Sequence, residues 1–170
     1  MINNFLVSWN SLVQGRIWTV VTSVFSHSML LHIFLNMFVL FNFGIIVENY
    51  LGQWRFFIFY LVAGMSGSLM HTIVCAFILN QPNVMALGAS GAISGVLILF
   101  ALLNPKEIIF LFGIIPLPAI WAAILFMGID AYGLFNQARG VMSPIGYGAH
   151  LGGAMVGIIY YFVIRLSKIN

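Results

Sequence analysis

Residues 86–103 read ALGASGAISGVLILFALL and place one serine, Ser90, between small residues at the start of a long apolar run. Gly91 and Gly95 are four residues apart. Small residues at this spacing lie on one face of a helix and let two membrane helices approach closely. The stretch therefore predicts a tightly packed helix with a polar side chain near its beginning.

The whole chain is similarly apolar. Of its 170 residues, 62% are hydrophobic and 5% are charged, and the mean hydropathy is +1.10. Because a soluble domain carries about 25% charged residues, the composition predicts a multi-pass integral membrane protein surrounded by the lipid bilayer. The few charges are scattered singly, which argues against nucleic acid as a partner. The single cysteine, Cys75, lies in an apolar run and is interpreted as a small buried hydrophobe.

Five stretches are apolar enough to be membrane helices, which need roughly 20 residues each. They cover residues 24–47, 56–79, 86–103, 117–135 and 147–166. We therefore expect an all-α transmembrane bundle that forms one domain, residues 1–170, with residues 1–23 as an outer interfacial segment. Pro116 and Pro118 argue against a continuous helix, so residues 108–115 are predicted to lie on the membrane surface.

Five crossings place the two ends of the chain on opposite sides of the membrane. Basic residues favour the inner side, which supports an N-terminus outside. Four basic residues then lie inside and two outside: Arg55, Lys106, Arg165 and Lys168 against Arg16 and Arg139. The first, third and fifth helices are parallel in this topology, so Ser90 and His150 lie at similar depth near the outer surface.

Four polar residues are predicted to converge on the outer half of this bundle. Ser90 is a candidate nucleophile and His150 its candidate general base, because a serine hydroxyl needs a neighbouring base to become reactive. His32 and Asn36 share one face of the first helix, since they are four residues apart. Their side-chain N–H groups and the Ser90 backbone N–H are candidate donors to an oxyanion.

Glycines make this convergence feasible. The pairs Gly91 and Gly95, and Gly153 and Gly157, give the third and fifth helices grooves without side chains. Gly88 and Gly91 flank the serine segment and leave space for a substrate backbone beside the hydroxyl.

No carboxylate is well placed in the sequence to orient His150. Glu48 lies at the inner end of the first helix, and Asp130 is the only carboxylate inside a predicted span. The sequence therefore favours a Ser–His dyad over a triad. It contains no H-E-x-x-H pattern, and neither a metal nor a cofactor is expected.

Each of these residues also has a structural explanation on its own. A serine between glycines is usually packing material, and a membrane histidine or asparagine often forms a hydrogen bond between helices. His27 and His71 are interpreted in this way, with His27 bracing the outer loop. A transporter or channel is a third interpretation, but it requires a more continuous polar path than Asp130 alone provides. The catalytic interpretation depends on the joint arrangement.

Several segments resemble the rhomboid intramembrane serine proteases, and their order along the chain is the order found in that family. GASG at 88–91 is similar to the nucleophile motif of that family, and AHLGG at 149–153 to its histidine motif. FSHSMLLHIFLNM at 25–37 matches its H-x4-H-x3-N pattern. The flanking segments are RIWTVVTSVF at 16–25, FGIIVENYLG at 43–52 and YLVAG at 60–64.

The resemblance implies that Ser90 is the nucleophile and His150 the base, with an oxyanion hole formed by His32, Asn36 and the Ser90 backbone N–H. It implies that Gly88 shapes the site and that Gly153 and Gly157 pack the helices. The expected activity is endopeptidase cleavage in or near transmembrane segments of membrane-protein substrates. The alternative is an inactive relative that binds such proteins, but inactive members typically lack the serine or the histidine.

We expect a bacterial plasma membrane location, with an organelle membrane as the alternative. Two features depart from the family pattern. The usual core has six helices, and we expect this sequence to begin in the loop after the first: either the true start lies upstream, or the chain is a trimmed fragment, or the first helix is dispensable here. Ser94 stands where some members carry an aromatic ring against the histidine, so the sequence leaves open how His150 is held.

Overall fold

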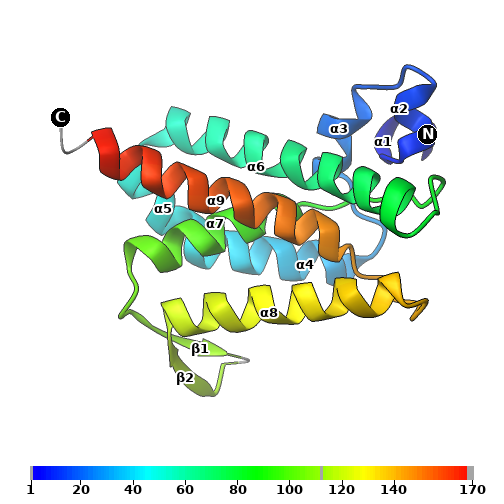
Figure 1. The fold of residues 1–170 in the computed structure, drawn as a ribbon. Coiled ribbons are helices and arrows are strands. Elements are labelled where there is room, and N and C mark those ends of the chain that lie inside the picture. Colours follow the sequence, from blue (N-terminus) through cyan, green and yellow to red (C-terminus); the bar gives the residue numbers. More distant parts are fainter. Residues whose placement is uncertain (1, 112, 168–170) are drawn as a thin grey trace.

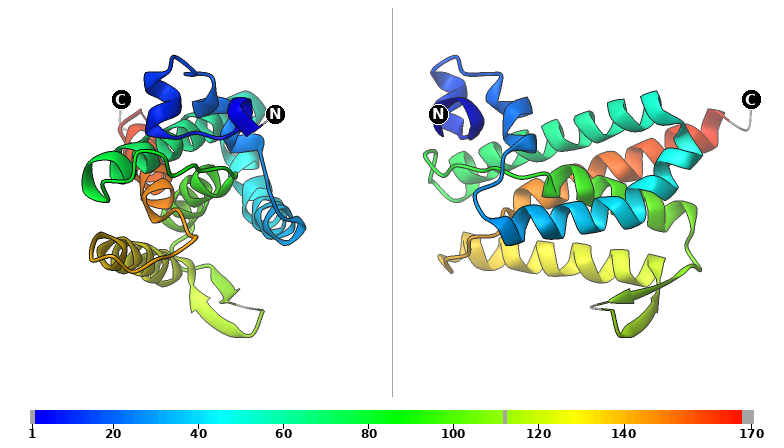
Figure 2. Two further views of the ribbon diagram at one scale, coloured as in Figure 1. Left: turned by 90° about the vertical axis from the view of Figure 1, so that its right-hand side faces the viewer. Right: turned by 180° about the vertical axis from the view of Figure 1, so that it is seen from behind.

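The computed structural model describes residues 2–111 and 113–167 as a helical bundle with one small hairpin (Figures 1 and 2). Lys168, one of the basic residues assigned to the inner side, lies outside the described residues. The elements in chain order are α1 (Ile2–Phe5), α2 (Trp9–Val13), α3 (Thr19–Thr22), η1 (Ser23–Phe25), α4 (Leu30–Val39), η2 (Leu40–Gly44), α5 (Ile45–Leu51), α6 (Gln53–Ile73), η3 (Val74–Ile78), α7 (Ser90–Leu103), β1 (Ile108–Leu111), β2 (Ile115–Pro118), α8 (Ala119–Ala138) and α9 (Tyr147–Ser167).

The predicted bundle of about five membrane helices is confirmed. Within the described residues, four helical stretches are long and apolar enough to cross a membrane: Leu30–Leu51, Gln53–Ile78, Ala119–Ala138 and Tyr147–Leu166. The remaining predicted helix, α7, is third in chain order and has 14 residues. At 1.5 Å per residue it is about 21 Å long, which is shorter than the roughly 30 Å hydrocarbon core. In Figure 1 the short helices α1 and α2 and the last turn of α9 lie at opposite ends of the bundle.

Helix α7 is the buried centre of the bundle. Val96 and Leu99 are fully buried, because α6, α9 and the α4–α5 segment surround this helix in place of lipid. Two features of the sequence make this position available to α7. After Ser94 its side chains are apolar on all sides, and its glycines allow close packing on α6 and α9.

The glycines of α7 and α9 form a contact between two parallel helices. Gly91 lies against Gly153, and Gly95 lies against both Gly153 and Gly157, so contacts advance in the same direction along both helices. A Cβ atom on Gly153 would lie 2.6 Å from the carbonyl carbon of Gly91. Only a residue without a side chain fits at this approach distance.

Helix α6 packs on α7 in the opposite direction. Gly64 faces Ala92, whereas Ala63, one residue earlier, faces Gly95. This antiparallel packing, together with the parallel pair α7 and α9, matches the alternating directions expected of consecutive membrane helices.

Two helices begin later than the sequence predicts. The first predicted helix starts at Leu30 and not at residue 24, which leaves His27 in the loop before α4. The third starts at Ser90 and not at residue 86, because Ala86 forms a β-bridge with Val7 and Gly88 has a φ of +119°. The other three spans agree with the predicted ranges to within three residues.

A hairpin replaces the surface segment that the prolines suggested. β1 and β2 are antiparallel, with Ile109 opposite Leu117, and they add a two-stranded sheet to the expected all-α fold. Pro116 and Pro118 are compatible with β2 because it is an edge strand, where missing N–H donors are tolerated. The hairpin lies where α7 ends and α8 begins, whereas the short helices α1 to α3 lie at the other end of the bundle (Figure 1).

Candidate active site

Ser90 is the first residue of α7, and the segment before it determines where the serine lies. The Val7 and Ala86 backbones exchange two hydrogen bonds, of 3.1 and 2.8 Å, and the Gly88 N–H donates to the Ser23 carbonyl at 2.9 Å. These contacts hold residues 86–88 in an extended path, after which the chain turns into the helix. As the first residue of α7, Ser90 has a backbone N–H without an acceptor inside the helix.

Gly88 is required at this turn for two reasons. Its φ of +119° is a conformation that L side chains rarely adopt. In addition, a Cβ atom on it would lie 2.6 Å from Cε1 of His32, so the imidazole packs directly on the glycine. The Gly88 backbone therefore brings His32 next to the segment that carries Ser90.

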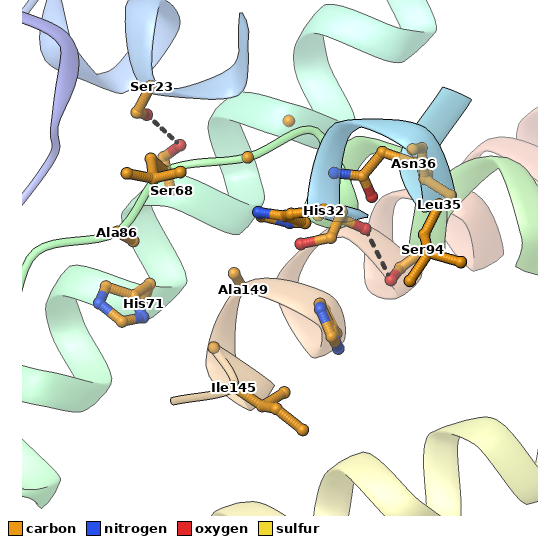
Figure 3. A pocket seen from close by; sticks show the side chains of 18 of the residues that line it. Ser23, His32, Leu35, Asn36, Ser68, His71, Ala86, Ser94, Ile145 and Ala149 are labelled. Atoms are coloured by element: carbon orange, nitrogen blue, oxygen red, sulfur yellow. Dashed lines mark hydrogen bonds between the residues drawn. The ribbon is translucent and has the colours of Figure 1, made fainter. Parts of the chain in front are cut away.

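His150 lies in the first turn of α9, and the glycine contact brings this turn beside the start of α7. Ser90 and His150 line one cavity of about 740 Å³, together with His32 and Asn36 from α4. In the part of the chain that the structure describes, no hydrogen bond joins the Ser90 hydroxyl to His150. Catalytic hydrogen bonds are often long before substrate binds, so a shared cavity is the relevant observation. Figure 3 shows His32, Asn36 and Ser94 around this cavity.

His150 has a carboxylate partner, which corrects the expectation that no acid is placed to orient it. Nδ1 of His150 lies 3.0 Å from Oδ1 of Asp130, which is on α8 and is 4% exposed. Asp130 is the only carboxylate inside a predicted span, but its link to His150 is not apparent from spacing in the sequence. The signal that points to it is its charge, because a charged residue in a membrane helix usually faces the interior of the bundle and a polar partner.

An aromatic ring also packs against His150, although Ser94 does not supply it. Phe126 on α8 stacks on the imidazole with ring centroids 5.9 Å apart and an angle of 26° between the planes. Ser94 instead donates a hydrogen bond of 2.9 Å to the Ser90 carbonyl within α7. The ring that some family members carry on the serine helix is thus replaced here by one from α8.

Asn36 is held by His27, whose position is in the loop before α4. Nδ2 of Asn36 is 2.9 Å from Nε2 of His27, and Asn36 is buried. With Nδ2 as the donor, His27 is neutral and accepts at Nε2, so the second N–H of the amide is available for another acceptor. Burial lowers the pKa of His27, and the nearby His32 lowers it further, against the effect of a hydrogen bond with the Phe25 backbone. Both causes favour the neutral ring that Asn36 needs.

His71 and Cys75 form a separate contact on the α6–η3 segment. Sγ of Cys75 is buried and lies 3.4 Å from Nε2 of His71, which also lines the cavity.

Within residues 2–111 and 113–167, no three His, Cys, Asp or Glu side chains gather closely enough to hold a metal ion. The arrangement therefore provides a hydroxyl, a carboxylate-bound imidazole and several N–H donors around one cavity, which is suited to acyl transfer.

Comparison with known proteins gives a consistent result along the chain. The family model described as "Rhomboid domain" matches residues 14–167. "RHOMBOID-like protein 12, mitochondrial" of Arabidopsis thaliana is 32% identical over 99% of this chain and 52% of its own length. "Rhomboid protein 1, mitochondrial" of Saccharomyces cerevisiae is 35% identical over 86% of this chain and 41% of its own length. This chain therefore spans about half the length of these two relatives.

A third relative bears on activity. "Inactive RHOMBOID-like protein 8" of Arabidopsis thaliana is 34% identical over 46% of this chain and 22% of its own length. Similarity to rhomboid-like proteins therefore does not by itself establish protease activity.

The expectation of a bacterial plasma membrane is wrong. Two relatives that align over most of the chain carry mitochondrial names, and the structure has helices that could span a membrane. These findings point to an organelle membrane.

Proposed function

Because the chain belongs to the rhomboid family, we propose that it is a serine endopeptidase that cleaves membrane proteins in or near their transmembrane segments. The observation that carries the proposal is that Ser90 and His150, from two different helices, line the same cavity as His32 and Asn36. A structural role for any one of these polar residues would not require the other three to face the same cavity. By analogy with the relatives, we propose an organelle membrane as its location.

In the proposed reaction, His150 removes the proton from the Ser90 hydroxyl as Oγ attacks the carbonyl carbon of the scissile peptide bond. The negative charge that develops on the carbonyl oxygen is stabilised by N–H groups of Asn36, His32 and the Ser90 backbone. His150 then gives its proton to the leaving amine, and an ester links Ser90 to the N-terminal part of the substrate. Water hydrolyses this ester by the same steps, and Ser90 regains its proton.

The proposed substrate must expose a carbonyl group that a helix normally hides. In a transmembrane helix each carbonyl accepts a backbone hydrogen bond, and lipid offers no replacement partner. Segments that contain helix-weakening residues such as glycine or proline are therefore the expected substrates, because they unwind at lower free-energy cost. The cavity also has to admit water, and its serine, histidine and asparagine side chains are suited to this.

The alternative function is an inactive protein that binds membrane-protein clients. The relative named as inactive is the observation in its favour. Against it stands the presence of both Ser90 and His150, since loss of either residue would remove the nucleophile or its base.

A fluorescent fluorophosphonate probe distinguishes the two functions. We expect the folded chain in detergent or liposomes to be labelled, and labelling to be lost in Ser90→Ala and in His150→Ala. Ser28→Ala is the matched control, because Ser28 is an exposed serine that lines the same cavity and has no role in the proposed reaction. Labelling of the Ser90→Ala variant, or a folded wild type that is not labelled, would contradict a serine-protease function.

A further inference from the structure

One face of α8 packs along the beginning of α9. Phe126, Asp130 and Gly133 have the i, i+4, i+7 spacing that places three residues on one side of a helix. Phe126 stacks on His150, Asp130 bonds to its Nδ1, and Gly133 lies against the ring of Tyr147, one turn earlier in α9. The absence of a side chain at Gly133 is what allows Tyr147, and with it the start of α9, to approach α8 closely.

The carboxylate of Asp130 is buried among mainly apolar surroundings. It is 4% exposed, in a helix that otherwise presents mainly apolar side chains to its surroundings. Burial of an unpartnered carboxylate costs several kcal/mol, so its position indicates a specific partner. In the structure its hydrogen-bond partner is the imidazole of His150. The other ionisable side chains that line the cavity are His32 on α4 and His71 on α6.

The direction of this hydrogen bond determines the state of the imidazole. A carboxylate only accepts, so Nδ1 of His150 must carry the proton that lies between the two groups. The neutral ring then has its lone pair on Nε2, the atom that a general base uses. When the ring takes a second proton, the adjacent carboxylate stabilises the positive charge.

We propose that Asp130 is a positioning residue that extends the predicted Ser90–His150 dyad to a Ser–His–Asp arrangement, with its carboxylate supplied by α8. The proposal rests on the proposed function, since it assigns the base its tautomer. It also makes α8 part of the active machinery: displacement of α8 from α9 would leave His150 without its hydrogen-bond partner and its stacking ring together.

The first test measures the rate of fluorophosphonate labelling in wild type, Asp130→Asn and Asp130→Glu. The asparagine has nearly the same shape but no negative charge, and we expect a rate about 10²- to 10⁴-fold lower. The glutamate restores the acceptor, and we expect it to recover at least tenfold relative to the asparagine. Glu107→Gln is the control, because it removes an equal charge from an exposed residue beside the hairpin. An Asp130→Asn variant that is labelled at the wild-type rate would overturn the proposal.

The second test does not depend on a variant of Asp130 or on activity. Nitrogen-15 NMR of histidine-labelled protein, with His150→Gln to assign the signals, reports which ring nitrogen carries the proton. A neutral His150 protonated at Nδ1 supports the proposal, and protonation at Nε2 overturns it. If the wild type is not labelled by the probe but His150 is protonated at Nδ1, the protease function fails while the pairing with Asp130 stands.

Discussion

The parallel glycine contact between α7 and α9 leads to a quantitative prediction for Gly153→Ala. The new Cβ atom would overlap the carbonyl oxygen of Gly91 and would lie 2.6 Å from the carbonyl carbon and 3.3 Å from Cα of that residue, whereas ordinary contacts are 3.4–4 Å. All three atoms belong to the backbone, so no side chain can rotate away and the two helices must separate. Overpacking of this kind costs about 3 kcal/mol, at the upper end of the usual range.

A partly compensating gain has to be subtracted. Replacement of a helical glycine by alanine stabilises the helix itself by about 1 kcal/mol, so the expected net loss in free energy of unfolding is about 2 kcal/mol. Gly128→Ala is the matched control, because Gly128 is in the middle of α8 and its Cβ position has no atom within 4 Å. That variant is expected to gain about 0.5–1 kcal/mol.

The assay is reversible unfolding in mixed micelles of a mild detergent and sodium dodecyl sulfate, followed by circular dichroism. The two variants should differ by about 3 kcal/mol, because one carries the steric cost and both carry the helix gain. Equal stability of Gly153→Ala and Gly128→Ala would refute the packing argument.

Two further predictions concern the surroundings of the oxyanion donors. Gly88→Ala combines an unfavourable φ with a contact to His32, and we expect at least a tenfold loss of probe labelling. Gly52→Ala is the control for strain away from the cavity, because Gly52 has a φ of +82° and an open Cβ position, and we expect labelling near the wild-type rate. Because the pKa of His27 in the folded protein lies below its ordinary 6.5, the unfolded chain binds the proton more readily. Thermal stability should therefore fall as the pH drops below about 6.5, and less steeply in His27→Gln; identical pH profiles would exclude this role of His27.

The packing of the bundle follows from local patterns that a reader of the sequence can see. Glycine pairs spaced by four residues predict close helices, and apolar runs predict their number and order. The start of α7 is harder to predict. It depends on a β-bridge between Val7 and Ala86, which are far apart in the chain, and on the positive φ of Gly88, which composition does not reveal.

The environment of His150 shows a different limit of sequence analysis. Asp130 and Phe126 lie 20 and 24 residues before it, and nothing in their own stretch says which face of α8 meets α9. Intramembrane polar residues usually face the interior of a bundle, and this holds for Asp130 as it does for His32 and Asn36. For Asp130 the rule predicts a polar partner inside the bundle and leaves only the choice among the histidines.

The shortness of α7 has a consequence for membranes of different thickness. Its last residue, Leu103, is followed by the polar sequence Asn-Pro-Lys-Glu, which favours the lipid headgroup region on that side. A helix of about 21 Å measured from that boundary holds Ser90 roughly 10 Å below the opposite boundary of a 30 Å hydrocarbon layer. A thicker bilayer would lengthen the distance from Ser90 to this opposite boundary, whereas its distance to the boundary at Leu103 stays fixed by the length of the helix. The position along a spanning segment that meets the serine is therefore set by lipid chain length as well as by the segment's own sequence.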